Sequence, residues 1–195
     1  MSVGQLMLVV VAAALVNNFV LVQFLGLCPF VGASRRLEGA IGMSLATGLV
    51  LTTASGLSYL VDHFLLRPYG LEYLRLLAFI LVIGAAVQLT EHLIRRLSPV
   101  LYRVLGLYIP LIASNCAVLG VALLNTSANR SFIAALFYGT GAALGFGLVL
   151  VMLAGLRERL ETADVPEVFK GSAIAFITAG IMSLAFLGFS GFARL

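Results

Sequence analysis

Apolar residues in this chain come in long runs, separated by short segments that hold most of the charged residues. Each run is about 20 residues long, the length of helix that crosses a hydrocarbon layer of about 30 Å. The runs lack the alternation expected of barrel strands, so we predict helices, which satisfy their backbone groups internally. The pattern predicts six transmembrane helices, at Val3–Leu25, Gly39–Val61, Tyr73–Leu93, Leu101–Leu124, Ser131–Leu156 and Gly171–Phe192.

The composition supports an all-α membrane protein. Of the 195 residues, 62% are hydrophobic and 10% are charged, whereas soluble domains carry about 25% charged residues. We therefore predict a single integral membrane domain over residues 1–195. The net charge of +4 is explained by loop arginines that orient the helices, and it requires no nucleic acid partner. Residues 1–34 carry no charge, so the basic region of a cleaved signal peptide is missing and a retained first helix is expected.

The fourth predicted span contains a segment that should interrupt its helix. Ile109–Gly120 reads IPLIASNCAVLG. Pro110 has no backbone donor, so a helix through it must kink or break. Asn115 and Cys116 follow with no charge nearby.

The first apolar run is longer than a membrane requires. As one helix, residues 1–34 would reach about 51 Å. The surplus could be a loop at the interface, or a broken segment that folds Cys28 and Pro29 back to membrane depth. The adjacent Asn17 and Asn18 favour the broken segment, because polar residues in membranes usually face the bundle interior.

Short sequence matches recur along the chain at a nearly constant separation, which indicates an internal repeat with halves of about 1–97 and 98–195. Each half would hold three spans, an odd number, so the second half would enter the membrane with opposite polarity. We therefore predict a 3+3 inverted repeat with helices one and four interrupted. The matches are Asn18 with Asn115 and Ala78–Ile80 with Ala175–Ile177, each 97 apart, and Gly48–Leu51 with Gly147–Leu150, 99 apart.

The distribution of lysine and arginine predicts the orientation. The connections after spans one, three and five hold eight such residues, and the opposite side holds four. The positive-inside rule then places both termini outside the cytoplasm. The eight are Arg35, Arg36, Arg95, Arg96, Arg103, Arg157, Arg159 and Lys170; the four are Arg67, Arg75, Arg130 and Arg194.

The two cysteines, Cys28 and Cys116, are the candidate metal ligands, and three interpretations are open. They could be small buried hydrophobic residues, a disulfide, or ligands of an iron–sulfur cluster, zinc or Cu(I). A cluster normally takes four protein ligands. His63 and His92 are predicted at opposite membrane faces, so they cannot both complete one site. The other two thiolates of any cluster would come from another chain.

Charged residues offer weaker candidates. Glu91, His92 and Arg95 could form an interfacial ion pair or a gate or proton relay. The mixed-sign segment 157–167 is predicted to be a solvated loop, with partner docking as the alternative. No motif in the chain forms a complete active site.

Three long motifs resemble a known family of membrane subunits, which includes the A subunit of the bacterial Rnf complex and the E subunit of the sodium-pumping NADH:quinone reductase. A fourth segment, RERLETADVPEVFKG at Arg157–Gly171, fits the same family, and the resemblance covers essentially the whole chain. The motifs are FLGLCPF at Phe24–Phe30, IPLIASNCAVLGVALLN at Ile109–Asn125, and ITAGIMSLAFLGFSG at Ile177–Gly191.

The resemblance implies a multi-pass subunit of an inner-membrane complex, a translocase that couples ferredoxin–NAD electron transfer to ion transport. It implies that Cys28 and Cys116 are cofactor-binding residues and metal ligands of a [2Fe–2S] cluster. A homologous subunit of opposite topology would supply two further cysteines, and other Rnf-type subunits would carry the flavin and further iron–sulfur centres. Both termini are expected in the periplasm, and the expected partners are these subunits and the lipid bilayer, with no nucleic acid. The alternative is a stand-alone secondary transporter that uses asparagines and backbone carbonyls at its interrupted helices.

Overall fold

The computed structural model describes residues 3–16, 18–97, 109–163, 166 and 169–192, and every regular element in these ranges is helical. The first half holds α1 (Val3–Val11) with a π-helical turn (Ala12–Val16), α2 (Phe19–Val22), α3 (Leu27–Ala33), α4 (Leu37–Val61), a second π-helical turn (Asp62–Leu66), α5 (Arg67–Tyr69), a 3-10 turn (Glu72–Leu74) and α6 (Arg75–Leu97). The second half holds α8 (Ile109–Ala113), α9 (Cys116–Ser127), α10 (Phe132–Glu161) and α11 (Ser172–Phe192).

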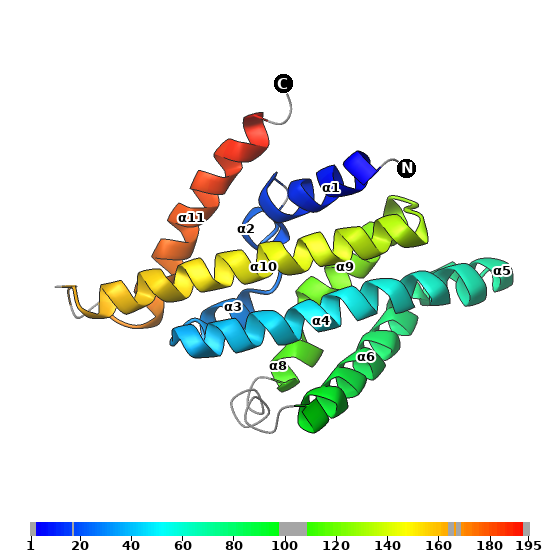
Figure 1. Ribbon diagram of the computed structural model, residues 1–195, viewed down its shortest axis with the longest axis horizontal. Helices are drawn as coiled ribbons and strands as arrows, with labels where there is room; N and C mark the ends of the chain where they lie inside the picture. Colours follow the sequence, from blue (N-terminus) through cyan, green and yellow to red (C-terminus); the bar gives the residue numbers. More distant parts are fainter. Residues whose placement is uncertain (1–2, 17, 98–108, 164–165, 167–168, 193–195) are drawn as a thin grey trace.

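Helices α4 and α10 form the centre of the molecule and run antiparallel side by side (Figure 1). Small residues bring them close together. A Cβ built on Gly48 would lie 3.5 Å from the Cβ of Ala143, and one built on Gly147 would lie 3.2 Å from the Cβ of Ser44. These two contacts are equivalent in the repeat, because Ala143 lies 99 positions after Ser44 and Gly147 lies 99 positions after Gly48.

The remaining helices flank this pair. α1 and its π-helical turn pack on α10, α9 packs on α4, and α6 and α11 leave opposite ends of the pair and slope outward in opposite directions (Figure 1). The core lies between these layers, where Phe19 of α2 stacks on Phe146 of α10 with ring centroids 6.4 Å apart.

Helical geometry is interrupted at two asparagines, Asn18 and Asn115. Asn18 caps α2 with φ −64° and ψ 106°, and its Oδ1 accepts from the Val20 N–H at 3.1 Å. Asn115 caps α9 with φ −75° and ψ 111°, and its Oδ1 accepts from the Ala117 N–H at 3.0 Å. The same backbone geometry therefore occurs at both positions. Pro110 lies within α8, and the described break follows it at Asn115. Asparagine suits this position because its side chain satisfies the first free N–H groups of a new helix.

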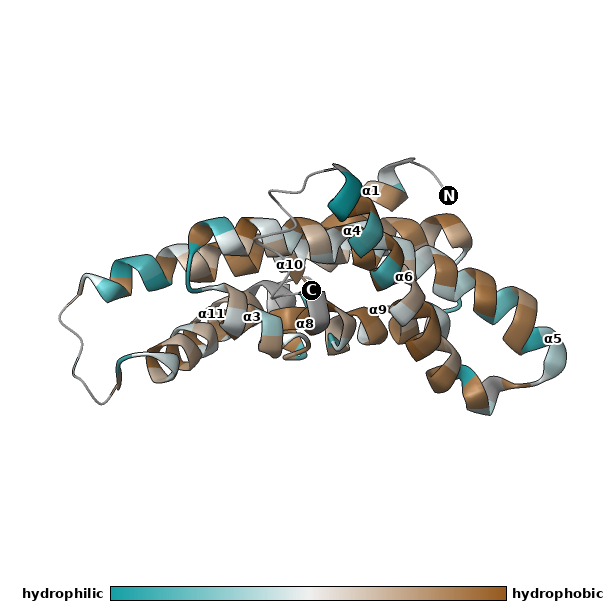
Figure 2. Ribbon diagram, turned by 90° about the horizontal axis from the view of Figure 1, so that it is seen from below, coloured by the Kyte–Doolittle hydropathy of each residue, from teal (hydrophilic) through white to brown (hydrophobic). Residues whose placement is uncertain are grey.

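In the part of the chain that the structure describes, four helical segments are long and apolar enough to cross a membrane: Gly4–Val22, Leu37–Tyr69, Arg75–Arg96 and Phe132–Glu161. Two shorter apolar helices, Leu111–Ser127 and Ser172–Gly188, lie where the fourth and sixth spans were predicted. The first part of the predicted span Leu101–Leu124 lies outside the described residues. Figure 2 shows hydrophobic colouring along the middle of the bundle, with hydrophilic residues at the C-terminal end of α10 and beside α5.

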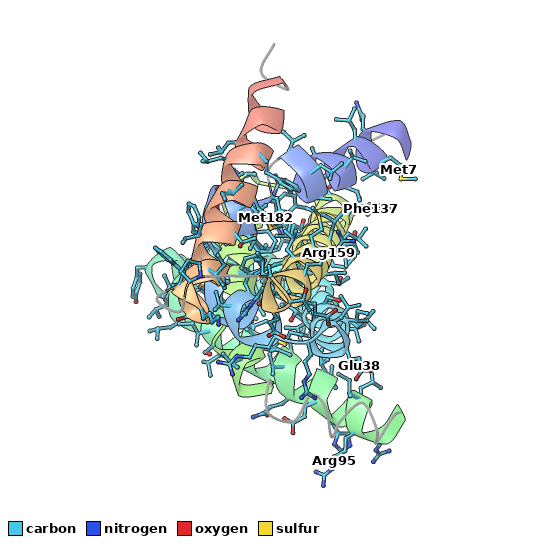
Figure 3. The ribbon with its side chains drawn as sticks, turned by 90° about the vertical axis from the view of Figure 1, so that its left-hand side faces the viewer. Met7, Glu38, Arg95, Phe137, Arg159 and Met182 are labelled. Atoms are coloured by element: carbon cyan, nitrogen blue, oxygen red, sulfur yellow. The ribbon has the colours of Figure 1, made fainter. Side chains whose placement is uncertain are left out.

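One predicted loop is largely helix. Residues 157–161 form the last turns of α10, which ends at Glu161, whereas Asp164 and Glu167 lie outside the described residues. The loop prediction was wrong here because charged residues in the last turns of a helix reach water without ending it. Figure 3 views the bundle from this end, with Arg159 on α10, Glu38 on α4 and Arg95 on α6. The Leu37 N–H donates to Glu158 Oε1 at 3.1 Å and joins α4 to α10 there.

Candidate functional site

The two cysteines belong to two different interrupted segments. Cys28 is the second residue of α3 and Cys116 is the first residue of α9. Both thiols are free and exposed, so neither is a buried core residue of this chain and the two do not form a disulfide. The Gly26 N–H donates to the Cys116 sulfur at 3.0 Å. The backbone two residues before Cys28 therefore contacts Cys116, and the fold gathers both cysteines into one local site.

A tight turn between α2 and α3 makes this approach possible. Phe24 has φ 55° and Gly26 has φ 84°, which is the left-handed region that glycine adopts at low cost. A Cβ on Gly26 would lie 3.1 Å from the Ala117 Cβ and 3.1 Å from Asn115 Oδ1, so only glycine fits this contact without displacement. Phe24 is the more unusual of the two at positive φ. Non-glycine residues in the left-handed region are strained, and such residues cluster at functional sites.

Proline often breaks a helix, but Pro29 lies in the first turn of α3. A missing N–H is tolerated there, because the first N–H groups of a helix have no partner within it. Helix α3 therefore begins at Leu27, and the chain turns before it.

Both cysteines lie at helix N-termini, and this position affects their chemistry. The free N–H groups and the helix dipole give an N-terminus a partial positive charge. A thiolate is the form of cysteine that ligates metals. Among the described residues, no three His, Cys, Asp or Glu side chains form a group that could hold a metal ion. The thiols of Cys28 and Cys116 are therefore exposed on the surface of this chain, where another molecule can reach them.

Asn115 has a spare donor beside the site. Asn18 is fully paired, because its Nδ2 donates to the carbonyls of Ala14 at 2.9 Å and Gly145 at 3.0 Å. Asn115 is 3% exposed, and its Nδ2 has no partner among the described residues. The two caps thus share a backbone geometry but differ in their side-chain contacts.

Comparison with known proteins settles the family. The family described as "Rnf-Nqr subunit, membrane protein" matches residues 6–193. The chain belongs to the Rnf-Nqr family. It is 58% identical over 194 residues to a protein of Vibrio cholerae (strain O395) named as the A subunit of an ion-translocating oxidoreductase complex, covering 100% of this chain and 91% of that one. A protein of the same name from Pseudoalteromonas atlantica is 60% identical over 190 residues, covering 97% and 98% of the two chains.

In this Rnf-Nqr chain the structure also identifies polar residues that the sequence did not single out. Asp62 is 4% exposed and lies between two arginines, with Oδ2 3.0 Å from Arg67 Nε and Oδ1 3.1 Å from Arg75 Nε. Arg67 also donates to Asn129 Oδ1 at 2.8 Å. The network joins the end of α4 to the start of α6 and to the α9–α10 turn. An acidic residue directly after an apolar run was the signal that could have revealed it.

Arg157 was expected in a solvated loop but is buried, with 9% exposure. Its Nη1 donates to the Val31 carbonyl at 2.9 Å and to Ser34 Oγ at 2.7 Å. Arg157 therefore holds the end of α3 against α10. Helix α3 is the helix that carries Cys28. The sequence did not predict this role, because a charge pattern does not distinguish a buried arginine from an exposed one.

Proposed function

We propose that this chain is a membrane subunit of an ion-translocating oxidoreductase complex of the Rnf type in the bacterial inner membrane. It takes part in electron transfer between ferredoxin and NAD and couples that transfer to ion transport. The full-length similarity to chains named as the A subunit of such a complex supports this assignment. The observation that supports the electron-transfer role is that the backbone two residues before Cys28 contacts the Cys116 sulfur while both thiols are exposed.

The thiols fit half of a [2Fe–2S] site. Such a cluster takes four cysteine thiolates, and this chain has two cysteines. Cys28 and Cys116 would be the ligands from this side, and the cluster, when bound, carries one electron at a time. The Gly26 N–H donates to the Cys116 sulfur, and such hydrogen bonds tune the reduction potential of a cluster.

A homologous subunit of opposite topology would supply the other two thiolates. Two observations support the inverted repeat on which this idea rests. Asn18 and Asn115, 97 positions apart, cap their helices in the same geometry. The contacts of Gly48 and Gly147 across α4 and α10 are equivalent at a spacing of 99. A partner built on the same repeat, but inserted upside down, would bring its own cysteines to the same depth. Other Rnf-type subunits would carry the flavin, and both termini of this chain would be periplasmic.

The test is to express the chain alone and together with its homologous partner, and then to measure iron and the EPR signal after reduction. Iron should appear only with the partner present. Cys28→Ser and Cys116→Ser should each abolish it, because a serine oxygen is a poor ligand for iron that thiolates hold. Ala113→Ser is the matched control, since it adds a hydroxyl on the neighbouring helix α8 and removes no thiol.

The outcomes separate the two candidate functions. Stoichiometric iron in the lone chain would overturn the shared site. Unchanged ferredoxin–NAD activity in either cysteine variant would make that cysteine structural. A stand-alone secondary transporter would need only its interrupted helices. Ion flux through the reconstituted lone chain, unaffected by loss of both cysteines, would therefore favour the transporter.

A further inference from the structure

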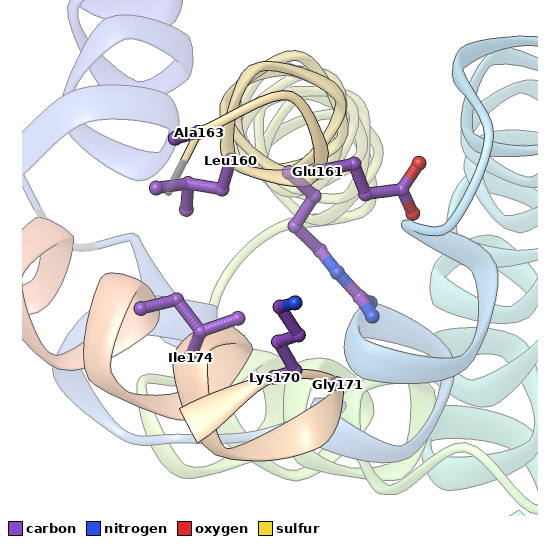
Figure 4. A pocket seen from close by; sticks show the side chains of 7 residues that line it. Leu160, Glu161, Ala163, Lys170, Gly171 and Ile174 are labelled. Carbon is purple, nitrogen blue, oxygen red and sulfur yellow. The ribbon is translucent and has the colours of Figure 1, made fainter. Parts of the chain in front are cut away.

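Two pockets meet where α3, α10 and α11 come together, at the end of the bundle that holds the C-terminus of α10. One has a volume of about 290 Å³ and lies between α10 and α11 (Figure 4). The other has a volume of about 370 Å³ and reaches α3 through Val31, Gly32 and Arg35. Arg157 and Glu161 line both pockets, so the two form one continuous site around these side chains.

Arg157 is the central cation of this site. A guanidinium carries five N–H donors in a fixed fork, and Nη1 is the nitrogen that donates to Val31 and Ser34. In the described part of the chain, no salt bridge neutralises Arg157 and its remaining donors have no protein partner. Burying a charge in this way is costly unless the charge is paired.

The described charged side chains that line the two pockets are mostly cationic. Arg35 lines one pocket and Lys170 the other, and the charge of Arg35 repels that of Arg157. Among the described residues that line the pockets, Glu161 is the single acidic one, and it attracts Arg157. Figure 4 shows the Lys170 amine pointing into the space between α10 and α11, and the Glu161 carboxylate directed away from it. Among the described residues, three cations and one carboxylate therefore line the two pockets.

We propose that this junction binds a phosphate group, carried by the headgroup of an anionic phospholipid. An arginine fork matches the oxygens of a phosphate. Leu160 and Ile174 provide an apolar wall beside the cations, which suits the start of an acyl chain. Basic pockets between transmembrane helices on the cytoplasmic side are suited to anionic headgroups, and the positive-inside prediction places this end there.

The test uses the full chain in its complex, purified in neutral detergent and titrated with short-chain phosphatidylglycerol in native mass spectrometry. Arg35→Gln with Lys170→Gln removes two pocket cations and none of the hydrogen bonds that hold α3 to α10. Each basic group near a lipid headgroup is worth about fivefold in affinity, so the pair should weaken binding by about 25-fold. The matched control is Arg36→Gln with Arg159→Gln, which removes two exposed cations near the same end that line neither pocket.

Each outcome decides the proposal. A large loss in the pocket variant and less than about a threefold loss in the control supports the site. Equal losses in both variants, or no loss in the pocket variant, overturn it. Titration with inorganic phosphate and with phosphatidylcholine identifies the source. Binding of phosphatidylglycerol alone supports the lipid headgroup, whereas equal binding of inorganic phosphate at the same sites overturns the lipid and leaves a soluble phosphate as the ligand.

Discussion

Replacing Gly145 with alanine tests how α10 supports the first helix break. A Cβ at Gly145 would lie 2.8 Å from the Ala14 carbonyl oxygen, 2.9 Å from the Ala14 Cα and 3.0 Å from Asn18 Nδ2. Two of these three atoms are backbone, so they cannot rotate away from the new methyl group. The π-helical turn and the Asn18 cap would have to move off α10, and the bond from Asn18 Nδ2 to the Gly145 carbonyl would lengthen.

The magnitude follows from three effects. Overpacking a close contact costs about 1–3 kcal/mol. A hydrogen bond between membrane helices contributes about 1 kcal/mol. Alanine is the better helix former by about 1 kcal/mol, which offsets part of the loss. The net expectation is that Gly145→Ala lowers the free energy of unfolding by about 1–3 kcal/mol.

Gly155 provides the matched control on the same helix. A Cβ there has no atom within 4 Å, so Gly155→Ala should show only the helix-propensity gain of up to about 1 kcal/mol. The free energies of the two variants can be compared by SDS titration in mixed micelles, followed by far-UV circular dichroism. Equal unfolding midpoints for Gly145→Ala and Gly155→Ala would refute the close contact between α10 and the first break.

Three further predictions concern charge, orientation and exposure. Asp62→Asn should lower the free energy of unfolding by about 1–3 kcal/mol in the same titration. This loss is smaller than for a fully buried ion pair, because the Arg67 side chain is 42% exposed. An unchanged unfolding midpoint would show that the network adds no stability. Reporter fusions at Arg67 and Arg159 should give opposite readouts, and equal readouts would overturn the six-span topology. A membrane-permeant maleimide should label both cysteines in the lone chain and neither after the partner docks; equal labelling in both states would contradict a shared site.

Sequence patterns predicted the helix breaks well because they depend on local chemistry. Asparagine in an apolar run has few ways to satisfy its side chain, and capping a new helix is one of them. Asn17 and Asn18 indicated the first break, whereas the second was predicted from Pro110 and is described at Asn115, with φ and ψ similar to those of Asn18. The long apolar runs likewise predicted helices at α1, α4, α6 and α10.

Features that depend on tertiary contact could not be read in the same way. The approach of Gly26 to Cys116 joins residues 90 positions apart, and no local pattern encodes it. Arg157 resembles any other arginine in a mixed-sign segment until Val31 and Ser34 are seen beside it. Pro29 resembles a helix breaker because the sequence does not show on which side of it the helix lies.

The exposure of the two thiols has a consequence for how the chain matures. Solvent-accessible thiols are open to oxidation, and Cys28 and Cys116 are both exposed in this chain. Under the proposed shared site, both thiols of a newly inserted chain stay uncovered until the partner subunit binds, and oxidants and stray metals can react with them in that interval. The length of that interval depends on how fast the complex assembles, so synthesis of this chain and of the protein that covers its cysteines would have to be balanced in time as well as in amount.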